Sequence, residues 1–331
     1  MMISDKHTPH QYKPDACKLR YRLARNFIDQ FYTSTYDATD DPGEGQQRLG
    51  VRSNFLGQFN FKSMTREALN EMDIIVNPSY IPSGKLKGKV AIITGGDSGI
   101  GRSIAVLYAK EGADIAIVYL KNGRDAQFTR KLVSAEGKIC RLYKGDISEE
   151  SFCRDVVRSV VKDFGLLSIL VNNAGMHVPD SSLKDISSRQ FKRTFDVNMF
   201  SFYYFTHEAL KFMKKGSSII NTASVVAFRG SDHLIDYSAS KGAIVSFTRS
   251  LSKNLATKGI RVNAVAPGPV WTPLIFESFS KSHIAEFGKE NPMKRAGLPR
   301  EVAPAYVFLA SEDASFISGQ VIHVNGGEIV D

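Results

Sequence analysis

Seven short apolar segments alternate with longer amphipathic ones from residue 85 to the end of the 331-residue chain, and this alternation narrows the choice of fold. The apolar segments have the length and residue types of buried strands, and the segments between them have helical spacing. The predicted strands cover 90–94, 115–119, 139–143, 168–171, 218–222, 261–265 and 321–324. The predicted helices cover 100–111, 125–136, 149–164, 188–213, 237–258 and 300–310. Near-continuous apolar strands joined by helices predict a parallel sheet with helices on both faces.

The turn after the first strand decides between two folds that share this alternation. Right-handed crossovers would give a doubly wound sheet, but a TIM barrel also alternates strands and helices. The turn reads TGGDSGIG over residues 94–101, with glycines at 95, 99 and 101. Glycines there allow a tight turn and close approach of the backbone to a pyrophosphate, which the N-terminus of the next helix attracts. This strand–turn–helix context predicts a dinucleotide-binding sheet of the Rossmann type.

The TGxxxGIG form of this turn resembles that of the short-chain dehydrogenase/reductase family. Further motifs follow in the family's order, and the resemblance covers residues 85–331. They are NNAG at 172–175, Asn198, Ser224, YSASK at 237–241, Pro267-Gly268 and NGG at 325–327. Segments such as 216–222, 241–251 and 264–274 look closest to the glucose and ribitol dehydrogenase-like branch of bacterial and plant proteins. The resemblance implies a seven-stranded α/β domain and an oxidoreductase that transfers a hydride between a nicotinamide and a carbonyl or alcohol.

Four side chains are predicted to carry the chemistry, namely Asn198, Ser224, Tyr237 and Lys241. Tyr237 and Lys241 are four residues apart on one predicted helix, so they share a face. A lysine ammonium nearby favours the phenolate and is expected to lower the pKa of Tyr237, which makes the phenol a useful general acid and base. Ser224 follows the fifth strand, at the edge that faces the cofactor, where its hydroxyl can hold the substrate oxygen.

The resemblance assigns further residues to the site. Asn198 matches an asparagine that supports a water path to the lysine, and Lys241 matches the lysine that binds the nicotinamide ribose. Asp146 and its apolar neighbour Ile147 match the adenine contact, and Thr272 matches the carboxamide contact. The predicted cofactor-binding residues are Thr94, Gly95, Asp97, Ser98, Gly99, Ile100, Gly101, Lys121, Arg124, Asp146, Ile147, Asn173, Ala174, Gly175, Tyr237, Lys241, Pro267, Gly268, Val270 and Thr272.

The second strand bears on which nicotinamide is used. NAD-preferring members carry an acidic residue at its end, to hold the adenosine ribose. Here the end reads YLKNGR over residues 119–124, with no carboxylate. Lys121 and Arg124 could meet a 2′-phosphate, and Arg102 follows the glycine turn. NADP(H) is therefore the preferred cofactor, with NAD(H) open, since both side chains could equally be solvated loop charges.

The substrate is predicted only by class. The branch resemblance suggests a small carbonyl, a sugar or a polyol. Residues 270–293 are expected to form a variable lid, with aromatic side chains that either contact the substrate or pack the lid on the domain, the second for most of them. These side chains are Trp271, Phe276, Phe279 and Phe287. His233 is expected in a loop that borders the substrate.

Other classes of function fit less well. Ser224 does not lie in the G-x-S-x-G turn of a hydrolase, and the chain has neither H-E-x-x-H nor a C-x-x-C pair, so no metal site is predicted. A non-catalytic dinucleotide-sensing protein remains an alternative, although Tyr237 and Lys241 are both retained. The three cysteines are far apart, which argues against a disulfide scaffold. The net charge of +9 is dispersed over residues 81–331, and no nucleic-acid partner is predicted.

Residues 1–84 are interpreted as an N-terminal extension and linker, and residues 85–331 as the catalytic domain. The extension contains predicted helices at about 15–32 and 65–72, while the segment from Pro78 to Gly84 reads as the linker. The apolar runs are too short for a membrane span, the first ten residues lack a secretory signal, and acidic residues argue against a transit peptide. A cytoplasmic location is predicted. The resemblance implies a homodimer or homotetramer, with the helices at 188–213 and 237–258 packing between subunits.

Overall fold

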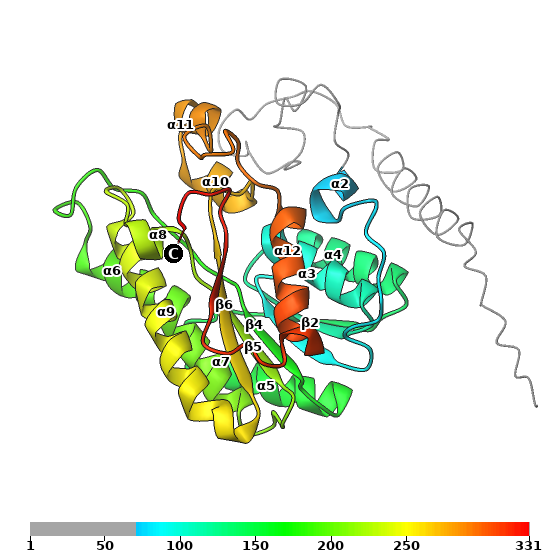
Figure 1. Ribbon diagram of the computed structural model, residues 1–331. Coiled ribbons are helices and arrows are strands. Elements are labelled where there is room, and N and C mark those ends of the chain that lie inside the picture. The colour runs from blue at the N-terminus through cyan, green and yellow to red at the C-terminus, as the bar shows by residue number, and fades with distance from the viewer. Residues whose placement is uncertain (1–70, 331) are drawn as a thin grey trace, which may run out of the picture. The chain divides into compact units, whose positions relative to one another are not determined.

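The computed structural model describes residues 71–330 (Figure 1). The predicted helix at 15–32 and most of the one at 65–72 lie outside these residues. Seven parallel strands form one sheet in the order β3-β2-β1-β4-β5-β6-β7. They are β1 (Val90–Thr94), β2 (Asp114–Tyr119), β3 (Cys140–Lys144), β4 (Ile169–Asn172), β5 (Ser218–Thr222), β6 (Arg261–Pro267) and β7 (Val321–Val324). The predicted doubly wound sheet of the Rossmann type is confirmed.

Helices cover both faces of the sheet (Figure 1). They are α2 (Glu71–Ile75), α3 (Gly99–Lys110), α4 (Gly123–Ala135), α5 (Glu150–Phe164), α6 (Ser188–Phe195), α7 (Ser201–Ala209), α8 (Val226–Arg229), α9 (Ile235–Leu255), α10 (Pro273–Ser278), α11 (Lys281–Glu286) and α12 (Pro299–Ala310). Single turns of 3-10 helix, η3 (Ala256–Lys258) and η4 (Glu312–Ala314), follow α9 and α12.

Strand β1 explains why the sheet needs both layers. Its sequence VAIIT is buried along its whole length, and successive side chains point to opposite faces. Ile93 joins the apolar core that includes α3, α4 and α12, whereas Ile92 joins the core that includes α5 and α7. Both faces of the strand are therefore covered by apolar side chains, as a parallel sheet requires.

The helix predicted at 188–213 differs from the observed structure. It is divided into α6 and α7 by a π-helical segment, η2 (Asp196–Phe200), and α7 ends at Ala209. A π turn adds a residue to the helical repeat, which turns the side chains that follow it relative to those before, and such turns often occur at functional sites. Asn198 lies in this segment. Hydrophobic spacing does not reveal it, because the flanking helices keep the ordinary period.

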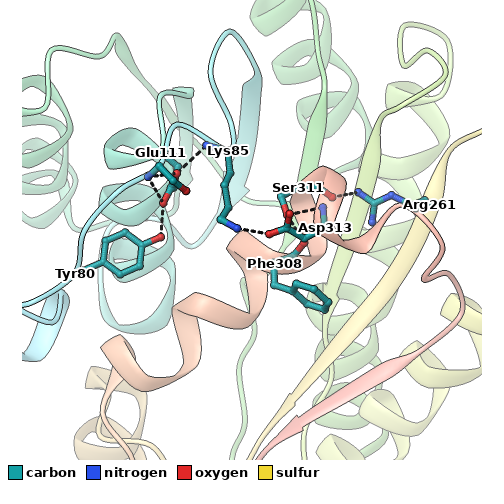
Figure 2. A network of polar contacts seen from close by, with 8 residues as sticks. Tyr80, Lys85, Glu111, Arg261, Phe308, Ser311 and Asp313 are labelled. Atoms are coloured by element: carbon teal, nitrogen blue, oxygen red, sulfur yellow. Dashed lines mark hydrogen bonds and ion pairs between the residues drawn. The ribbon is translucent and has the colours of Figure 1, made fainter. Parts of the chain in front are cut away.

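The segment before β1 is fixed to the core by polar contacts (Figure 2). Glu111, at the end of α3, is fully buried and accepts hydrogen bonds from the Tyr80 hydroxyl and from the backbone N–H groups of Ser83 and Lys85. The Lys85 side chain pairs with Asp313 in η4. The apolar side chains at 74–76 are also buried. The packing of the sheet domain therefore extends upstream of residue 85.

Candidate active site

Two strands far apart in the sequence meet at the carboxyl edge of the sheet. The chain runs from β1 outward to β3 and then returns to β4 on the other side of β1, which makes this edge the switch point where such sheets bind ligands. The Thr94 hydroxyl accepts hydrogen bonds from the backbone N–H groups of Asn173, at 2.9 Å, and Ala174, at 3.0 Å. The Asn173 amide donates to the Thr94 carbonyl. These contacts fix the NNAG motif against the glycine turn.

The glycine turn leaves no space for side chains. Gly95 and Gly99 have φ angles of 65° and 51°, in the left-handed region that favours glycine. A Cβ atom on Gly101 would lie 2.0 Å from the Gly95 carbonyl oxygen, so the helix approaches the turn closely. A Cβ atom on Gly99 would lie 3.2 Å from the Thr272 methyl group, which brings the predicted carboxamide contact next to the turn.

The start of α3 fits a pyrophosphate. Ser98 occupies the N-cap position but makes no capping hydrogen bond through its side chain, and the first turn carries no acidic residue. The first N–H groups of a helix need acceptors, and an anion supplies them together with a favourable interaction with the helix dipole. The residues at this turn therefore fit the phosphates of a dinucleotide.

Arg102 has a structural role at this turn. It is 6% exposed and donates to the backbone oxygen of Asp97 and to the Thr129 hydroxyl, and it pairs with Asp125 at 3.1 Å. The arginine thus fastens the turn to α4. Lys121 and Arg124, in contrast, are exposed and make no ion pair with any of residues 71–330. They flank the N-terminus of α4, where the Asn122 side chain already caps the Asp125 N–H group, so positive charge for a second phosphate group is supplied there by these two side chains.

The Asp97 carboxyl, in the glycine turn, has a raised pKa. Burial raises its pKa to about 6, although the charge of Arg102 opposes the shift. The negative charges of Asp125 and of Glu277 in α10 add to the increase. The carboxyl can therefore be neutral at slightly acidic pH, which reduces its repulsion of an anionic ligand.

Ser224, Tyr237 and Lys241 come together at the carboxyl end of β5. Ser224 follows the strand and is 9% exposed, and its hydroxyl interacts with that of the half-buried Tyr237 so as to lower the pKa of the phenol. Lys241 is 2% exposed, and its ammonium lies 5.5 Å from the centre of the Tyr237 ring. The only hydrogen bond of that ammonium to the described residues goes to the Thr222 carbonyl, at 2.7 Å.

The pKa values of this pair differ from the expectation. Burial raises the pKa of Tyr237 to about 12, and the hydrogen bond from Ser224 only partly opposes it. Burial lowers the pKa of Lys241 to about 7. The lysine is therefore only partly charged near neutral pH, and it cannot offset the effect of burial on the phenol. In the chain without cofactor, the pKa of Tyr237 is therefore raised, whereas the sequence predicted that it would be lowered.

Asn198 makes several contacts from the π-helical segment. It is fully buried, its carbonyl accepts from the Met176 N–H at 2.8 Å, and its amide donates to the Met176 carbonyl at 2.9 Å and to Ser240 at 3.0 Å. A Cβ atom on Gly175 would lie 3.4 Å from the Asn198 oxygen and 3.6 Å from the Lys241 nitrogen. Gly175 thus leaves open the space between the asparagine and the lysine.

The remaining predicted residues lie along the same edge. Asp146 follows β3 and pairs with Arg193 at 2.7 Å. Burial raises the pKa of its carboxyl, but the hydrogen bonds from Ser148 and Arg193 outweigh burial and lower that pKa below its ordinary value. Ile147 and Val270 are buried. The Pro267 carbonyl accepts from the Val225 N–H, and a Cβ atom on Gly268 would lie 2.7 Å from Asn325, so this turn also needs a glycine.

Two polar residues near the site were missed by the sequence reasoning. Asp236 is fully buried and accepts hydrogen bonds from Thr194 in α6, at 2.7 Å, and from the Tyr237 N–H, at 2.8 Å. His177 is 7% exposed and stands edge-on to Tyr237. Each lies next to a recognised motif, and that adjacency was the available signal. Their burial could not be predicted from it.

The lid aromatics pack mainly on one another. Trp271 packs against Phe276 and Phe287, with ring centres 5.4 and 4.9 Å apart, in an apolar cluster of the lid itself. Phe279 packs against the same cluster and also contacts His177, with ring centres 5.3 Å apart. The expected packing role therefore holds for most of them. His233 is exposed and paired with Asp232.

Within residues 71–330, no cluster of His, Cys, Asp or Glu side chains has the grouping of a metal site. Cys140 and Cys153 are buried free thiols. No helix in this part of the chain is long and apolar enough to cross a bilayer.

Comparison with known proteins identifies the family. A family model described as enoyl-(acyl carrier protein) reductase matches residues 95–328. Glucose and ribitol dehydrogenase of Daucus carota is 49% identical over 77% of this chain and 90% of its own. The chloroplastic NADPH-dependent aldehyde reductase 1 of Arabidopsis thaliana is 50% identical over 76% of this chain and 90% of its own. A short chain dehydrogenase from Burkholderia cenocepacia, solved in complex with NADP, superimposes with a TM-score of 0.70 at 31% identity, over 74% of this chain and 99% of that one.

The fold and the glycine turn define a dinucleotide-binding protein. With these matches, the chain belongs to the short-chain dehydrogenase/reductase family and is an oxidoreductase of that family, related to the glucose and ribitol dehydrogenases.

Proposed function

We propose that this protein interconverts a carbonyl compound and the corresponding alcohol, with Tyr237 as the general acid and base. The observation that carries the proposal is the Ser224–Tyr237–Lys241 group at the switch-point edge, next to a turn that fits a pyrophosphate. When bound there, a nicotinamide cofactor supplies or accepts the hydride.

The side chains of the site transfer the proton and stabilise the charges that develop. In the reducing direction, Tyr237 donates its hydroxyl proton to the substrate oxygen, and Ser224 donates a hydrogen bond to the same oxygen as negative charge develops on it. In its protonated form, Lys241 stabilises the phenolate that remains, and its pKa of about 7 suits a group that returns a proton to this phenolate. Asn198 positions Met176 and Ser240 around the lysine.

The cofactor preferred by this chain is NADP(H), within the same proposal. Arg102 is committed to Asp97 and α4, whereas Lys121 and Arg124 remain exposed beside the N-terminus of α4. Two exposed cations favour a 2′-phosphate over a neutral ribose hydroxyl. The relative from Arabidopsis is named for its use of NADPH, and the Burkholderia structure holds NADP.

The substrate we propose is a small carbonyl compound, a sugar or a polyol. The names of two relatives, a glucose and ribitol dehydrogenase and an aldehyde reductase, support this range.

A second copy of the chain is proposed as the partner of the α6–α7 surface. Phe200 at the end of η2 and Tyr203 in α7 are 42% and 44% exposed and both contact the Tyr204 ring, and Phe191 in α6 is 37% exposed. Exposed aromatic side chains grouped on one surface are typical of interfaces. Sedimentation of the purified chain would show a dimer or tetramer, and a monomer at micromolar concentration would contradict it.

Substitution of the tyrosine tests the proposed reaction. Tyr237→Phe keeps the ring but removes the proton, so the rate of carbonyl reduction should fall by roughly a thousandfold or more. NADPH affinity, measured by fluorescence titration, should change by no more than about threefold, since one polar contact at most is removed. Tyr143→Phe is the matched control, because among residues 71–330 the Tyr143 hydroxyl bonds only the exposed Asp163, so its removal should leave the rate unchanged. Full turnover by Tyr237→Phe would refute the proposal.

A further inference from the structure

His177 lies beside the catalytic tyrosine and has no role in the function proposed above. It comes two residues after the NNAG motif, and the two hydrogen bonds between Asn198 and Met176 fix the backbone immediately before it. Its ring is edge-on to that of Tyr237, with centres 5.3 Å apart and an interplanar angle of 80°. The histidine is therefore presented to the reacting group by a rigid backbone.

The other contacts of the ring come from the lid. Phe279 packs against it at 5.3 Å between ring centres, so the imidazole lies between the catalytic tyrosine and a lid aromatic. The residue is 7% exposed, and its Nε2 atom is buried without a hydrogen-bond partner among the described residues. A phenylalanine would fill the same aromatic environment without burying an unpaired nitrogen.

Buried polar atoms are almost always hydrogen-bonded, because an unpaired one lowers stability. The exceptions are often functional. Here the unpaired nitrogen belongs to a ring that packs against the ring of Tyr237, the group that handles the substrate proton, so its missing partner is expected on the substrate.

The chemistry of that partner follows from the state of the ring. Burial and the charge of Lys241 lower the pKa of His177 to about 4, against the opposing effects of the Leu274 backbone and Asp236. The imidazole is therefore neutral at neutral pH, and each ring nitrogen is either a donor or an acceptor, according to the tautomer. A hydroxyl group can donate and accept, so it pairs with Nε2 in either tautomer.

We propose that His177 recognises a substrate hydroxyl near the reacting carbon, and so selects hydroxylated carbonyl compounds and polyols over their deoxy counterparts. This inference rests on the proposed function and names the substrate class within it. A substrate without the hydroxyl leaves the nitrogen unpaired, which is how a polar site rejects an apolar analogue.

Glyceraldehyde and propanal test the proposal, since both are three-carbon aldehydes and differ in their hydroxyl groups. The quantity to measure is the ratio of kcat/KM for glyceraldehyde to that for propanal. The wild-type ratio should exceed one by roughly tenfold or more, and His177→Phe should reduce it by a similar factor, the effect of one polar contact. His177→Gln retains a polar group and should restore part of the ratio.

Phe279→Leu is the matched control, because it alters the packing around His177 without removing a polar atom. Its ratio should stay close to that of the wild type. The proposal is overturned if His177→Phe lowers kcat/KM equally for both aldehydes, or if Phe279→Leu changes the ratio as much as His177→Phe does.

A binding measurement separates this proposal from the proposed reaction. Trp271 is the only tryptophan of the chain and lies in the lid, so its fluorescence can follow ligand binding without turnover. In the presence of NADPH, which cannot accept a hydride from ribitol, ribitol should bind the wild type roughly tenfold more tightly than it binds His177→Phe. Equal binding would overturn the role of His177. Full turnover by Tyr237→Phe, with ribitol binding still dependent on His177, would overturn only the reaction.

Discussion

The part of the site formed by β1, α3 and α4 differs from the part formed by β4, β5 and α9 in what holds it together. In the first part, backbone atoms approach one another so closely that glycine is required. The second part depends on buried polar side chains, such as Asn198 and Lys241, that reach across several elements. A close backbone approach fails when one methyl group is added, whereas a polar cluster is sensitive to protonation and to the loss of single partners.

The largest effect is expected at the glycine turn. Gly101→Ala would place a methyl group 2.0 Å from the Gly95 oxygen, so the turn or α3 must shift. We expect cofactor affinity to fall by more than about a hundredfold, and stability to decrease by roughly 1–3 kcal/mol, the usual effect of overpacking. Fluorescence titration with NADPH and urea denaturation would measure the two effects.

Gly242→Ala is the control for this comparison. It makes the same change inside α9, where a Cβ atom would have no neighbour within 4 Å. Alanine is the better helix former by about 0.8–1 kcal/mol, so stability should stay the same or rise. If Gly101→Ala bound NADPH as tightly as Gly242→Ala does, the turn would not depend on close approach.

A smaller effect, dependent on pH, is expected at Lys241. Its pKa of about 7 lies below the ordinary value of 10.5, so between these values the unfolded chain binds a proton that the folded chain does not. Wild-type stability should therefore rise with pH over this range, and Lys241→Met should lack that gain. The variant should be most stable relative to the wild type at pH 6, and this advantage should shrink by at least about 1 kcal/mol towards pH 9.5.

Urea denaturation at several pH values would follow the difference between the two proteins. Subtracting one pH from another removes the constant contribution of the lost hydrogen bond to Thr222. A difference that does not vary with pH would mean that Lys241 keeps an ordinary pKa in the folded chain.

The smallest effect is expected from the exposed cations of the first part. Lys121→Ala combined with Arg124→Ala should weaken NADPH binding roughly tenfold, the usual strength of hydrogen bonds to a charged group near solvent, and NADH binding much less. Arg130→Ala, another exposed arginine of α4, is the matched control. If the affinities for NADPH and NADH fell equally, the two side chains would contribute only general surface charge and would not recognise the 2′-phosphate.

Much of the fold could be predicted because its signals are local. Strand segments such as 90–94 are short, apolar and evenly separated, and the glycine turn is contiguous in the sequence. The Tyr237–Lys241 spacing on one helix was equally local. The burial of Glu111 and His177 could not be predicted, since it arises from segments far away in the chain. The π-helical turn at Asn198 and the reversed pKa shift of Tyr237 also depend on tertiary packing.

Glu111 has a practical consequence for where the folded unit begins. A protein cut to start at residue 85 would lose the Tyr80 hydroxyl and the Ser83 N–H, and a carboxylate deep in the interior would keep one of its three donors. Interior carboxylates without donors favour the unfolded chain, where water hydrates them. Residues 80–85 thus act as a cap over the buried Glu111 carboxyl, and any shortened form of this oxidoreductase needs to retain them.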